Sequence, residues 1–511
     1  MRLQTMSNIG RVPEELVVSR SDPVYMAHAY LTKVPVPAIV PFIEAYTQPG
    51  DTVLDPFAGS GMTGVAAAIT GRKARLSDIS VLGQHIGRNY VNLVDPEEFS
   101  KHGDAVIAAS RKRLGDIYGT TCQSCGQRAQ LAKSVWSLLL ECQSCGQHVN
   151  YYRALEAVNW RKSSIECTYC KAPLSNRARR VGEVPVLDYI ECSCSSSQLE
   201  QPAKIERPQV DLSKFDYPKV EITPDRQMYQ VSALGRNGLT TVAAFYSARN
   251  LAVLSTIRSE IENVADERIR SKLLFAFTAC LTRASKRYQW SRKRPLNAAN
   301  ANYYVAPVFY EWNVFDLFSR KIVAAVRSDD WIRQLRGDES LFQSELDVQY
   351  DLASADNLPL ADESIEYVFT DPPFGSNLFY ADMALFQEGW LGKFTNVELE
   401  AVIDRSRTGS RKAERYEALL TNALKECRRV LRRDGRITMV FGNSSGKIWA
   451  LVQRAIAAAG LKIEPDALVV LNKGQRSVKG LASGMEHVAT LDLILTMTKA
   501  DDASPPWKHV E

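Results

Sequence analysis

The spacing of apolar and polar positions predicts two regions in which short buried strands alternate with amphipathic helices. In the first region, residues 37–47 and 65–70 have the pattern of helices, and residues 52–54 and 73–79 have the pattern of strands. A helix between two short apolar strands is typical of a βαβ unit in a parallel sheet. The first region therefore predicts the start of an α/β domain.

The alternating pattern returns near residue 347 and continues almost to the end of the chain. Strands are expected at 347–353, 365–370, 436–441, 467–471 and 491–496, with helices at 412–431 and 447–459. Between the two regions, residues 121–194 hold most of the cysteines, residues 195–230 read as a surface connection, and residues 236–345 read as helical. One sheet is therefore expected to be interrupted by a long insertion.

These changes of pattern predict five segments. They are residues 1–115 and 346–500 as the two parts of the α/β domain, 116–200 as a cysteine-rich module, 201–345 as a linker with a helical insertion, and 501–511 as a tail.

The amino-acid composition is consistent with this predicted organisation and limits the possible partners of the protein. The 511 residues are 45% hydrophobic, which is enough for a full core, and the net charge of +5 permits a nucleic-acid partner without requiring one. The sequence contains no apolar run long enough to cross a membrane and no signal peptide. We therefore expect a cytoplasmic protein with no membrane partner, in which the ten cysteines serve as metal ligands or buried thiols. The sequence does not define an oligomeric state.

The first candidate site is a glycine-rich turn between an expected strand and an expected helix. Its sequence is Asp55-Pro56-Phe57-Ala58-Gly59-Ser60-Gly61. Glycines allow the backbone to approach a ligand closely, and the helix start offers free N–H groups. Asp78 ends the next strand, where a carboxylate can accept hydrogen bonds from ribose hydroxyls. The simpler interpretation is a tight turn with a capping aspartate.

The second candidate site is Asp371-Pro372-Pro373-Phe374, which follows a strongly apolar strand. Ligands of α/β sheets bind at the carboxyl ends of strands, and the prolines make this loop rigid. An exocyclic base amine is a poor nucleophile because its lone pair is delocalised into the ring. The Asp371 carboxylate and the Pro372 carbonyl could accept the amine hydrogens, and Phe374 could stack on an extruded base. The simpler interpretation is a capped turn.

Together these segments resemble the amino methyltransferases of nucleic acids, in particular adenine-specific DNA methylases with a zinc-ribbon insertion. The resemblance implies a Rossmann-like class I methyltransferase fold with a mostly parallel seven-stranded sheet, and S-adenosyl-L-methionine as cofactor. It assigns Asp55, Pro56, Phe57, Gly59 and Gly61 to the cofactor loop, Asp78 to the ribose, and Asp371, Pro372, Pro373 and Phe374 to catalysis.

Further segments agree with this resemblance. The stretch 28–35, which contains Lys33, looks like the part that holds the methionine end of the cofactor, and the turn with Asp356 looks like the part that contacts its adenine. The stretch 424–431, followed by Asp434-Gly435, looks like the helix and turn before the fifth strand.

The cysteines form pairs with the spacing of zinc knuckles. Cys122, Cys125, Cys142 and Cys145 are expected to bind one structural zinc ion, and Cys167, Cys170, Cys192 and Cys194 a second one, with His148 as an alternative ligand. One or two ions are thus expected. Redox activity is the rival interpretation, and four cysteines leave no open position for catalytic zinc. Cys280 and Cys427 are expected in the core.

A basic stretch with interleaved aromatic residues covers 283–294. It offers Arg283, Lys286, Arg287, Tyr288, Trp290, Arg292, Lys293 and Arg294 for phosphate contacts and base stacking, although a solvated charged face is an equal alternative. The following residues, including 297–304 and Tyr310-Glu311-Trp312-Asn313, are expected to form a loop that faces the active site.

The leading hypothesis is an adenine-N6 DNA methyltransferase, because aspartate in the tetrapeptide favours adenine in the family that the chain resembles. The alternatives are an RNA methyltransferase acting on guanine N2 or adenine N6, a cytosine-N4 DNA methyltransferase, and a catalytically silent scaffold. Restriction–modification, phage defence and epigenetic control are all compatible with the sequence.

Overall fold

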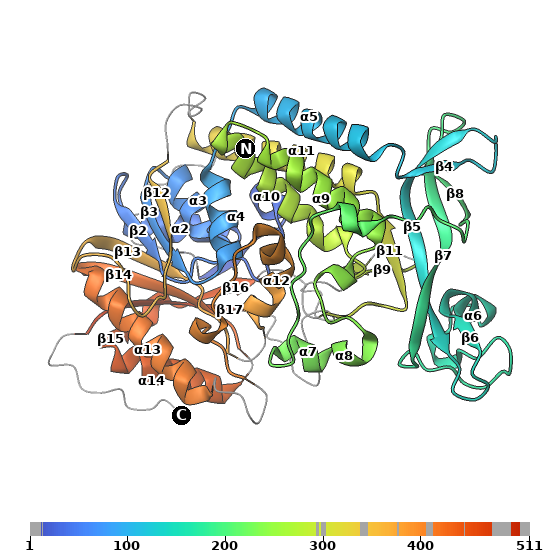
Figure 1. Cartoon of the computed structure of the whole chain (residues 1–511). Helices are drawn as coiled ribbons and strands as arrows, with labels where there is room; N and C mark the ends of the chain where they lie inside the picture. The colour runs from blue at the N-terminus through green and yellow to red at the C-terminus, as the bar shows by residue number, and fades with distance from the viewer. Residues whose placement is uncertain are drawn as a thin grey trace. The chain divides into compact units, whose positions relative to one another are not determined.

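A computed structural model of the chain describes residues 12, 14–292, 296–297, 303–337, 346–375, 378–404, 412–443, 445–472 and 492–500. The chain forms two compact units, coloured by sequence in Figure 1. Unit 1 comprises residues 1–96, 324–388 and 393–511, and unit 2 comprises residues 97–323 and 389–392. Unit 2 is thus inserted between parts of unit 1.

Unit 1 is built on a nine-stranded sheet. Its strands are β1 (Glu15–Val17), β2 (Thr52–Asp55), β3 (Lys73–Asp78), β12 (Val348–Leu352), β13 (Ile365–Thr370), β14 (Leu431–Phe441), β15 (Leu461–Ile463), β16 (Val469–Asn472) and β17 (Asp492–Lys499). The order is β1-β16-β17-β14-β13-β2-β3-β12, with β15 beside β17. Strands β12, β3, β2, β13 and β14 pair in parallel, and β17 is antiparallel to its neighbours.

The expected α/β fold with a mostly parallel sheet is confirmed, with one difference in strand number. Seven strands form the run β16-β17-β14-β13-β2-β3-β12, as expected, and β1 and β15 extend it to nine. β1 and β15 are each three residues long, so their apolar pattern is too short to be recognised in the sequence. The chain leaves the sheet after β3 and returns to it at β12.

Helices cover the sheet of unit 1. They are α1 (Pro23–Ala27), α2 (Val36–Tyr46), α3 (Met62–Ile69), α4 (Val81–Val91), α12 (Tyr380–Leu391), α13 (Ala413–Val430) and α14 (Gly446–Ala458). One apolar cluster joins β13 and β14 to α13 and α14, and it includes Cys427, which is buried as expected. The central strands are almost fully buried, which is typical of a parallel sheet covered on both faces. The buried central strands therefore fix the positions of the loops that follow β2 and β13.

Unit 2 contains an antiparallel sheet of eight strands. They are β4 (Gly119–Thr121), β5 (Arg128–Glu141), β6 (His148–Asn150), β7 (Arg180–Glu191), β8 (Leu199–Pro202), β9 (Tyr288–Gln289), β10 (Leu296–Asn297) and β11 (Val308–Trp312). The long strands β5 and β7 pair along most of their length. Figure 1 shows β4 and β8 near one end of this pair, and β6 with α6 (Tyr151–Ala157) at the other.

Besides α6, the α-helices between β3 and β12 that follow α4 are α5 (Pro96–Leu114), α7 (Gln227–Val231), α8 (Leu234–Asn237), α9 (Ala248–Glu262), α10 (Glu267–Ala284) and α11 (Val314–Arg336), and α11 continues from unit 2 into unit 1 at residue 324. Cys280 is buried in α10, as expected. The expectation of an all-helical segment from 236 to 345 is wrong, because β9, β10 and β11 fall inside it and join the sheet.

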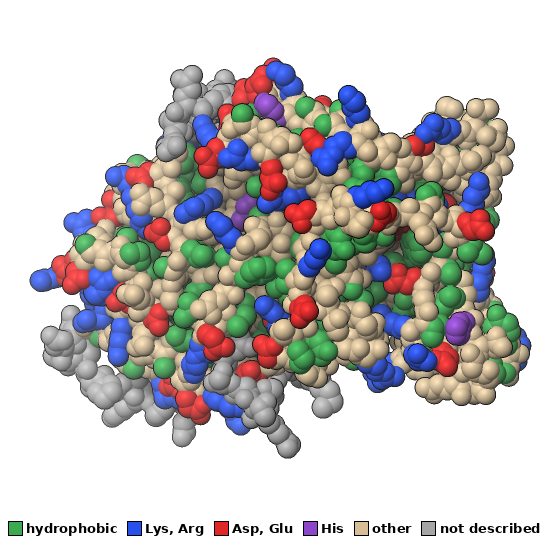
Figure 2. Space-filling model, viewed as in Figure 1, with side chains coloured by type: hydrophobic (Ala, Val, Ile, Leu, Met, Phe, Trp, Pro, Cys, Tyr) green, Lys and Arg blue, Asp and Glu red, His purple; other side chains and the backbone are tan. Residues whose placement is uncertain are grey.

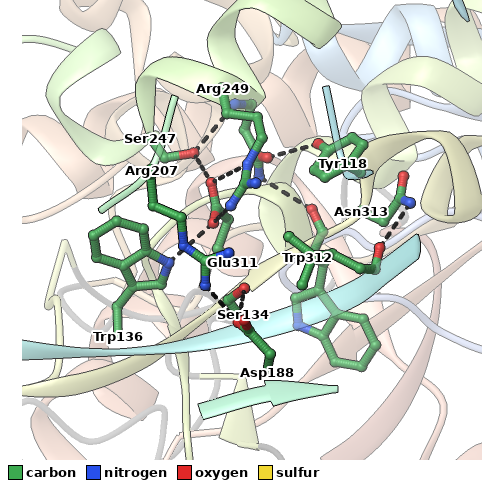
Figure 3. A network of polar contacts seen from close by, with 12 residues as sticks. Tyr118, Ser134, Trp136, Asp188, Arg207, Ser247, Arg249, Glu311, Trp312 and Asn313 are labelled. Atoms are coloured by element: carbon green, nitrogen blue, oxygen red, sulfur yellow. Dashed lines mark hydrogen bonds and ion pairs between the residues drawn. The ribbon is translucent and has the colours of Figure 1, made fainter. Parts of the chain in front are cut away.

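The expected loop at Tyr310–Asn313 is also wrong in its described part. Residues 308–312 form β11, whose five side chains are all buried, and β11 pairs with β5. Glu311 can lie in this buried strand because Arg249, Ser247 and Trp136 all bind its carboxylate, as Figure 3 shows. A buried ion pair of this kind cannot be recognised from sequence, since Arg249 lies on α9, far from Glu311 in the chain. Residues 298–302 lie outside the described part.

The surface seen in Figure 2 carries both signs of charge. Lys and Arg side chains are mixed with Asp and Glu over the described part of this face, in keeping with the small net charge of +5. No helix among the described residues combines the length and hydrophobicity that crossing a bilayer requires.

Candidate active site and cysteine clusters

The glycine-rich turn of residues 55–61, here called the cofactor loop, is braced by the side chain of Asp55. The Phe57 N–H donates a hydrogen bond to Asp55 Oδ1 at 3.1 Å, and the Thr63 hydroxyl donates to Oδ2 at 2.6 Å. Burial raises the pKa of Asp55 to about 7, although these hydrogen bonds oppose the rise. Both carboxylate oxygens of Asp55 thus hold the loop in shape.

Helix α4 packs directly against this loop through small residues. Gly61 has φ +78°, and a Cβ there would lie 2.7 Å from the Gly87 Cα. A Cβ on Gly83 would lie 2.5 Å from the Gly59 carbonyl oxygen. The Tyr350 hydroxyl donates to that same carbonyl at 2.6 Å. The loop is therefore fixed from two sides, and only glycines permit the close approach.

Asp78 and Lys33 flank the cofactor loop. Asp78 ends β3, and its carboxylate accepts hydrogen bonds from the N–H groups of Gly59 and Ser80, both at 2.8 Å. Burial raises the pKa of Asp78. Lys33 is buried; its ammonium donates to the His28 carbonyl at 2.8 Å and lies 4.2 Å from the centre of the Tyr25 ring. Lys33 thus holds the segment before α2 in place.

The tetrapeptide Asp371–Phe374 follows β13 and is held by a residue of α13 and by a residue of the loop before α14. The Tyr416 hydroxyl of α13 donates to the Pro373 carbonyl at 2.5 Å. The Asn443 amide, just before α14, donates to the Phe374 carbonyl at 2.7 Å. Among the described residues no hydrogen bond to the Pro372 carbonyl occurs. The ring of Phe374 packs edge-on against Phe441, with 5.3 Å between ring centres.

One cavity of unit 1 brings the two loops together. It encloses about 1000 Å³, including the part open to solvent. Nine predicted residues line it: Lys33, Asp55, Pro56, Phe57, Gly59, Asp78, Asp356, Asp371 and Pro373. Three predicted residues do not line it, namely Gly61, Pro372 and Phe374. The lining follows the carboxyl ends of β2, β3, β12 and β13, which are adjacent in the sheet.

Several residues that line the cavity were missed by sequence reasoning. Tyr380 begins α12, and its hydroxyl lies 3.1 Å from the Thr32 hydroxyl. Glu400 accepts a hydrogen bond from the Ala381 N–H at 3.0 Å, and Thr395 binds the N–H of Val81 at the start of α4 at 3.1 Å. None of these residues belongs to a motif, so only the fold reveals them. The nearest sequence signal was Tyr30 and Thr32 in the stretch around Lys33.

The eight knuckle cysteines form two clusters, but the expected pairing is wrong. Cluster 1 comprises Cys122, Cys125, Cys192 and Cys194, and cluster 2 comprises Cys142, Cys145, Cys167 and Cys170. The reason is the 14-residue strand β5, which at about 3.3 Å per residue separates the first two knuckles by roughly 46 Å. Strand β7 returns antiparallel and carries the last knuckle back to the first.

Both clusters have the dimensions of a tetrahedral zinc site. Sulfur atoms lie 3.8 Å (Cys122–Cys194) and 3.5 Å (Cys125–Cys192) apart in cluster 1, and 3.7 Å (Cys142–Cys170 and Cys145–Cys167) apart in cluster 2. Zn–S bonds of about 2.3 Å in a tetrahedron place sulfurs about 3.8 Å apart. The two clusters could therefore each hold a zinc ion. His148 belongs to neither cluster, so its expected role as a substitute ligand is wrong.

The basic aromatic stretch lies in unit 2, and several of its side chains have partners there. Lys286 forms an ion pair with Glu183 at 2.8 Å, and Arg287 is buried. Tyr288 is buried beneath Arg283, which lies 5.0 Å from its ring centre. The remaining described residues of the stretch, Trp290 and Arg292, are at least partly exposed. Lys293 and Arg294 lie outside the described residues.

Comparison with known proteins supports the family that the sequence resembles. Residues 11–95 match the family model described as DNA methylase. Over 83 residues the chain is 55% identical to the protein named "Putative methylase YubD" of Escherichia coli K12, a match that covers 16% of this chain and 30% of that protein. The chain thus matches less than a third of that relative's length.

Solved structures with similar elements include methyltransferases. One is described as a putative DNA modification methylase from Thermus thermophilus complexed with S-adenosyl-L-methionine, with 15% identity, 29% of this chain, 54% of that chain and a TM-score of 0.18. Another is a 16S rRNA (adenine(1408)-N(1))-methyltransferase from Catenulisporales acidiphilia, with 11% identity, 35% of this chain, 73% of that chain and a TM-score of 0.20.

The matched range includes Lys33, the cofactor loop and Asp78. Over residues 11–95, this chain is therefore similar to the DNA methylases of the N6/N4 type.

Proposed function

We propose that the protein transfers a methyl group from S-adenosyl-L-methionine to an exocyclic amine of a DNA base. The observation that carries this proposal is the cavity of unit 1, in which the cofactor loop and the Asp371 loop line the same space. The two loops are more than 300 residues apart in sequence, but they follow the adjacent strands β2 and β13. The match of residues 11–95 to a DNA methylase family supports the same interpretation.

The residues around the cavity fit S-adenosyl-L-methionine. Asp78 ends β3 and offers a carboxylate to ribose hydroxyls, and Asp356 lies in the turn after β12, where the adenine would lie. The cofactor loop and Lys33 also line the cavity. When bound, the cofactor supplies an electrophilic methyl group on a sulfonium ion.

The Asp371 loop would act on the base. The Asp371 carboxylate, which lines the cavity, and the carbonyl of the adjacent Pro372, which does not line it, would accept hydrogen bonds from the two amine hydrogens, so that the amine lone pair turns out of the plane of the ring. Transfer of the methyl group to the nitrogen would break its C–S bond, leave the cofactor as S-adenosyl-L-homocysteine, and release one amine hydrogen as a proton, which Asp371 could accept. Tyr416 and Asn443 hold the neighbouring carbonyls, and this keeps the loop rigid for the reaction.

We assign adenine N6 as the acceptor, because Asp371 occupies the first position of the tetrapeptide. Cytosine N4 in DNA and base amines in RNA have the same chemistry and are the alternatives that an experiment must separate. We also propose that each cysteine cluster holds one structural zinc ion, with four thiolates and no open coordination position.

The test is incubation of the full chain with cofactor labelled in the methyl group and with duplex DNA, single-stranded DNA or RNA. Digestion to nucleosides and mass spectrometry then identify the modified base. We expect N6-methyladenine from DNA and no transfer by Asp371→Ala, which should still bind cofactor because Asp55, Asp78 and Tyr350 supply the contacts described for the cofactor loop. No transfer to any nucleic acid by the wild-type chain contradicts the proposal.

A further inference from the structure

A second cavity lies in unit 2 and carries aromatic and basic side chains. Its lining includes Trp160, Trp290, Tyr304, Lys162, Arg292 and Asn176. We propose that this aromatic pocket binds a nucleobase of the DNA substrate outside the base that is methylated. The choice of DNA as ligand rests on the proposed function. The pocket itself rests on the geometry of unit 2.

The rings in the pocket are arranged as a stacking surface. The ring centres of Trp160 and Trp290 lie 5.1 Å apart, and that of Tyr152 lies 5.1 Å from Trp160 and 5.3 Å from Trp290. Tyr152 is buried and supports the other two, which remain partly exposed. Partly exposed rings fixed by a buried one can accept a base without reordering, and so lose little conformational entropy on binding.

The charge of the pocket suits a polyanion. The Arg292 guanidinium is exposed and lies 5.3 Å from the centre of the Trp160 ring, and Lys162 is also exposed. No carboxylate is among the described residues that line the pocket. Arg292 and Lys162 could contact phosphates that flank a stacked base. The exposed Asn176 amide offers one acceptor and one donor group to a base edge.

The backbone at Trp160 is held in an unusual conformation. Asn159 has φ +49° and Trp160 has φ +65°, which is uncommon for residues other than glycine. The Trp160 N–H donates to the Leu155 carbonyl at 2.8 Å and so keeps the turn after α6 closed. This turn places Trp160 against Trp290, which comes from the basic stretch more than 100 residues later. Strained positions of this kind cluster at ligand-binding sites.

Fluorescence anisotropy with the full chain tests this proposal. The probes are a fluorescein-labelled mixed-sequence oligonucleotide as a single strand and as a duplex, titrated at several salt concentrations. Trp160→Ala should weaken binding of at least one probe about 5- to 150-fold, the range expected for loss of one base stack. Trp160→Phe should restore most of the binding. Arg292→Ala should lower the salt dependence by about one phosphate contact.

Tyr169→Ala is the matched control, because it removes an exposed aromatic ring of unit 2 that lies outside the pocket. Unchanged binding by Trp160→Ala, or an equal loss in Tyr169→Ala, overturns the proposal. An effect of Arg292→Ala alone also overturns it, because that result indicates phosphate attraction without stacking. If the wild-type chain transfers no methyl group but Trp160→Ala still weakens oligonucleotide binding, the proposed methyl transfer is wrong and base binding by the aromatic pocket is still supported.

Discussion

The interleaved pairing of the knuckle cysteines can be tested with double variants. In the structure, Cys125 and Cys192 belong to cluster 1, whereas Cys145 belongs to cluster 2. Replacing Cys125 and Cys192 by serine therefore damages one cluster only, and replacing Cys125 and Cys145 damages both. Pairing in sequence order predicts the reverse, because it groups Cys125 with Cys145.

The size of the effect follows from the geometry. Each cluster has four sulfurs within 4.8 Å of one another, and loss of one thiolate leaves three ligands. Structural zinc in small domains contributes roughly 10–16 kcal/mol of apparent binding free energy at neutral pH, and a site without one thiolate is expected to release its ion to a chelator. The expected zinc content is two ions per chain for the wild type, one for Cys125→Ser/Cys192→Ser, and none for Cys125→Ser/Cys145→Ser.

The assay is elemental analysis of each purified chain after dialysis against a mild chelator, with protein quantified by amino-acid analysis. Cys280→Ser, at a buried cysteine far from both clusters in sequence, is the control and should keep two ions. One ion in Cys125→Ser/Cys145→Ser together with none in Cys125→Ser/Cys192→Ser would refute the interleaved pairing. A wild-type chain without zinc would refute the metal assignment itself.

Three further predictions concern the packing around the sites. Burial raises the pKa of Asp55 from 3.8 to about 7, so the folded state binds the proton more tightly than the unfolded state does. The free energy of unfolding should therefore fall by up to about 4 kcal/mol as the pH rises from about 4 to about 7. Asp55→Asn should flatten this pH dependence, as measured by urea unfolding. Gly83→Ala pushes a methyl group against a cofactor-loop carbonyl and should weaken binding of S-adenosyl-L-homocysteine in calorimetry, whereas Gly446→Ala, with open space around it, should not. Glu311→Gln leaves the buried Arg249 without its counter-charge and should cost about 3–5 kcal/mol of stability by thermal unfolding; an unchanged midpoint contradicts the role of the pair.

Much of unit 1 could be predicted because its signals are local. The strand before Asp55 and the strand before Asp371 are short, apolar and followed by distinctive loops, so both elements and both loops could be placed from sequence. The cavity also contains most of the residues named from those motifs. By contrast, Tyr380 and Glu400 reach it only through the packing of α12, which no sequence pattern reveals.

Unit 2 was harder to predict because its key contacts are distant in sequence. The knuckle spacing is local and was recognised, but the partner of each knuckle depends on the antiparallel return of β7. The polar and aromatic residues of β11 suggested a loop, and only the contact of Glu311 with Arg249 explains how a charged residue lies in a buried strand. Similarly, the need for glycine at position 83 cannot be recognised from the sequence, because it arises only where α4 packs against the cofactor loop.

The proposed methylation of an exocyclic amine of a DNA base can be tested in cells. The most direct measurement is quantitative mass spectrometry of nucleosides from the DNA of a methylation-deficient bacterial host that expresses either the wild-type chain or Asp371→Ala at equal levels. We expect N6-methyladenine in the wild-type sample and only background in the Asp371→Ala sample. N4-methylcytosine instead would correct the target base, and no methylated base amine in DNA, with the chain folded and binding its cofactor, would contradict the account.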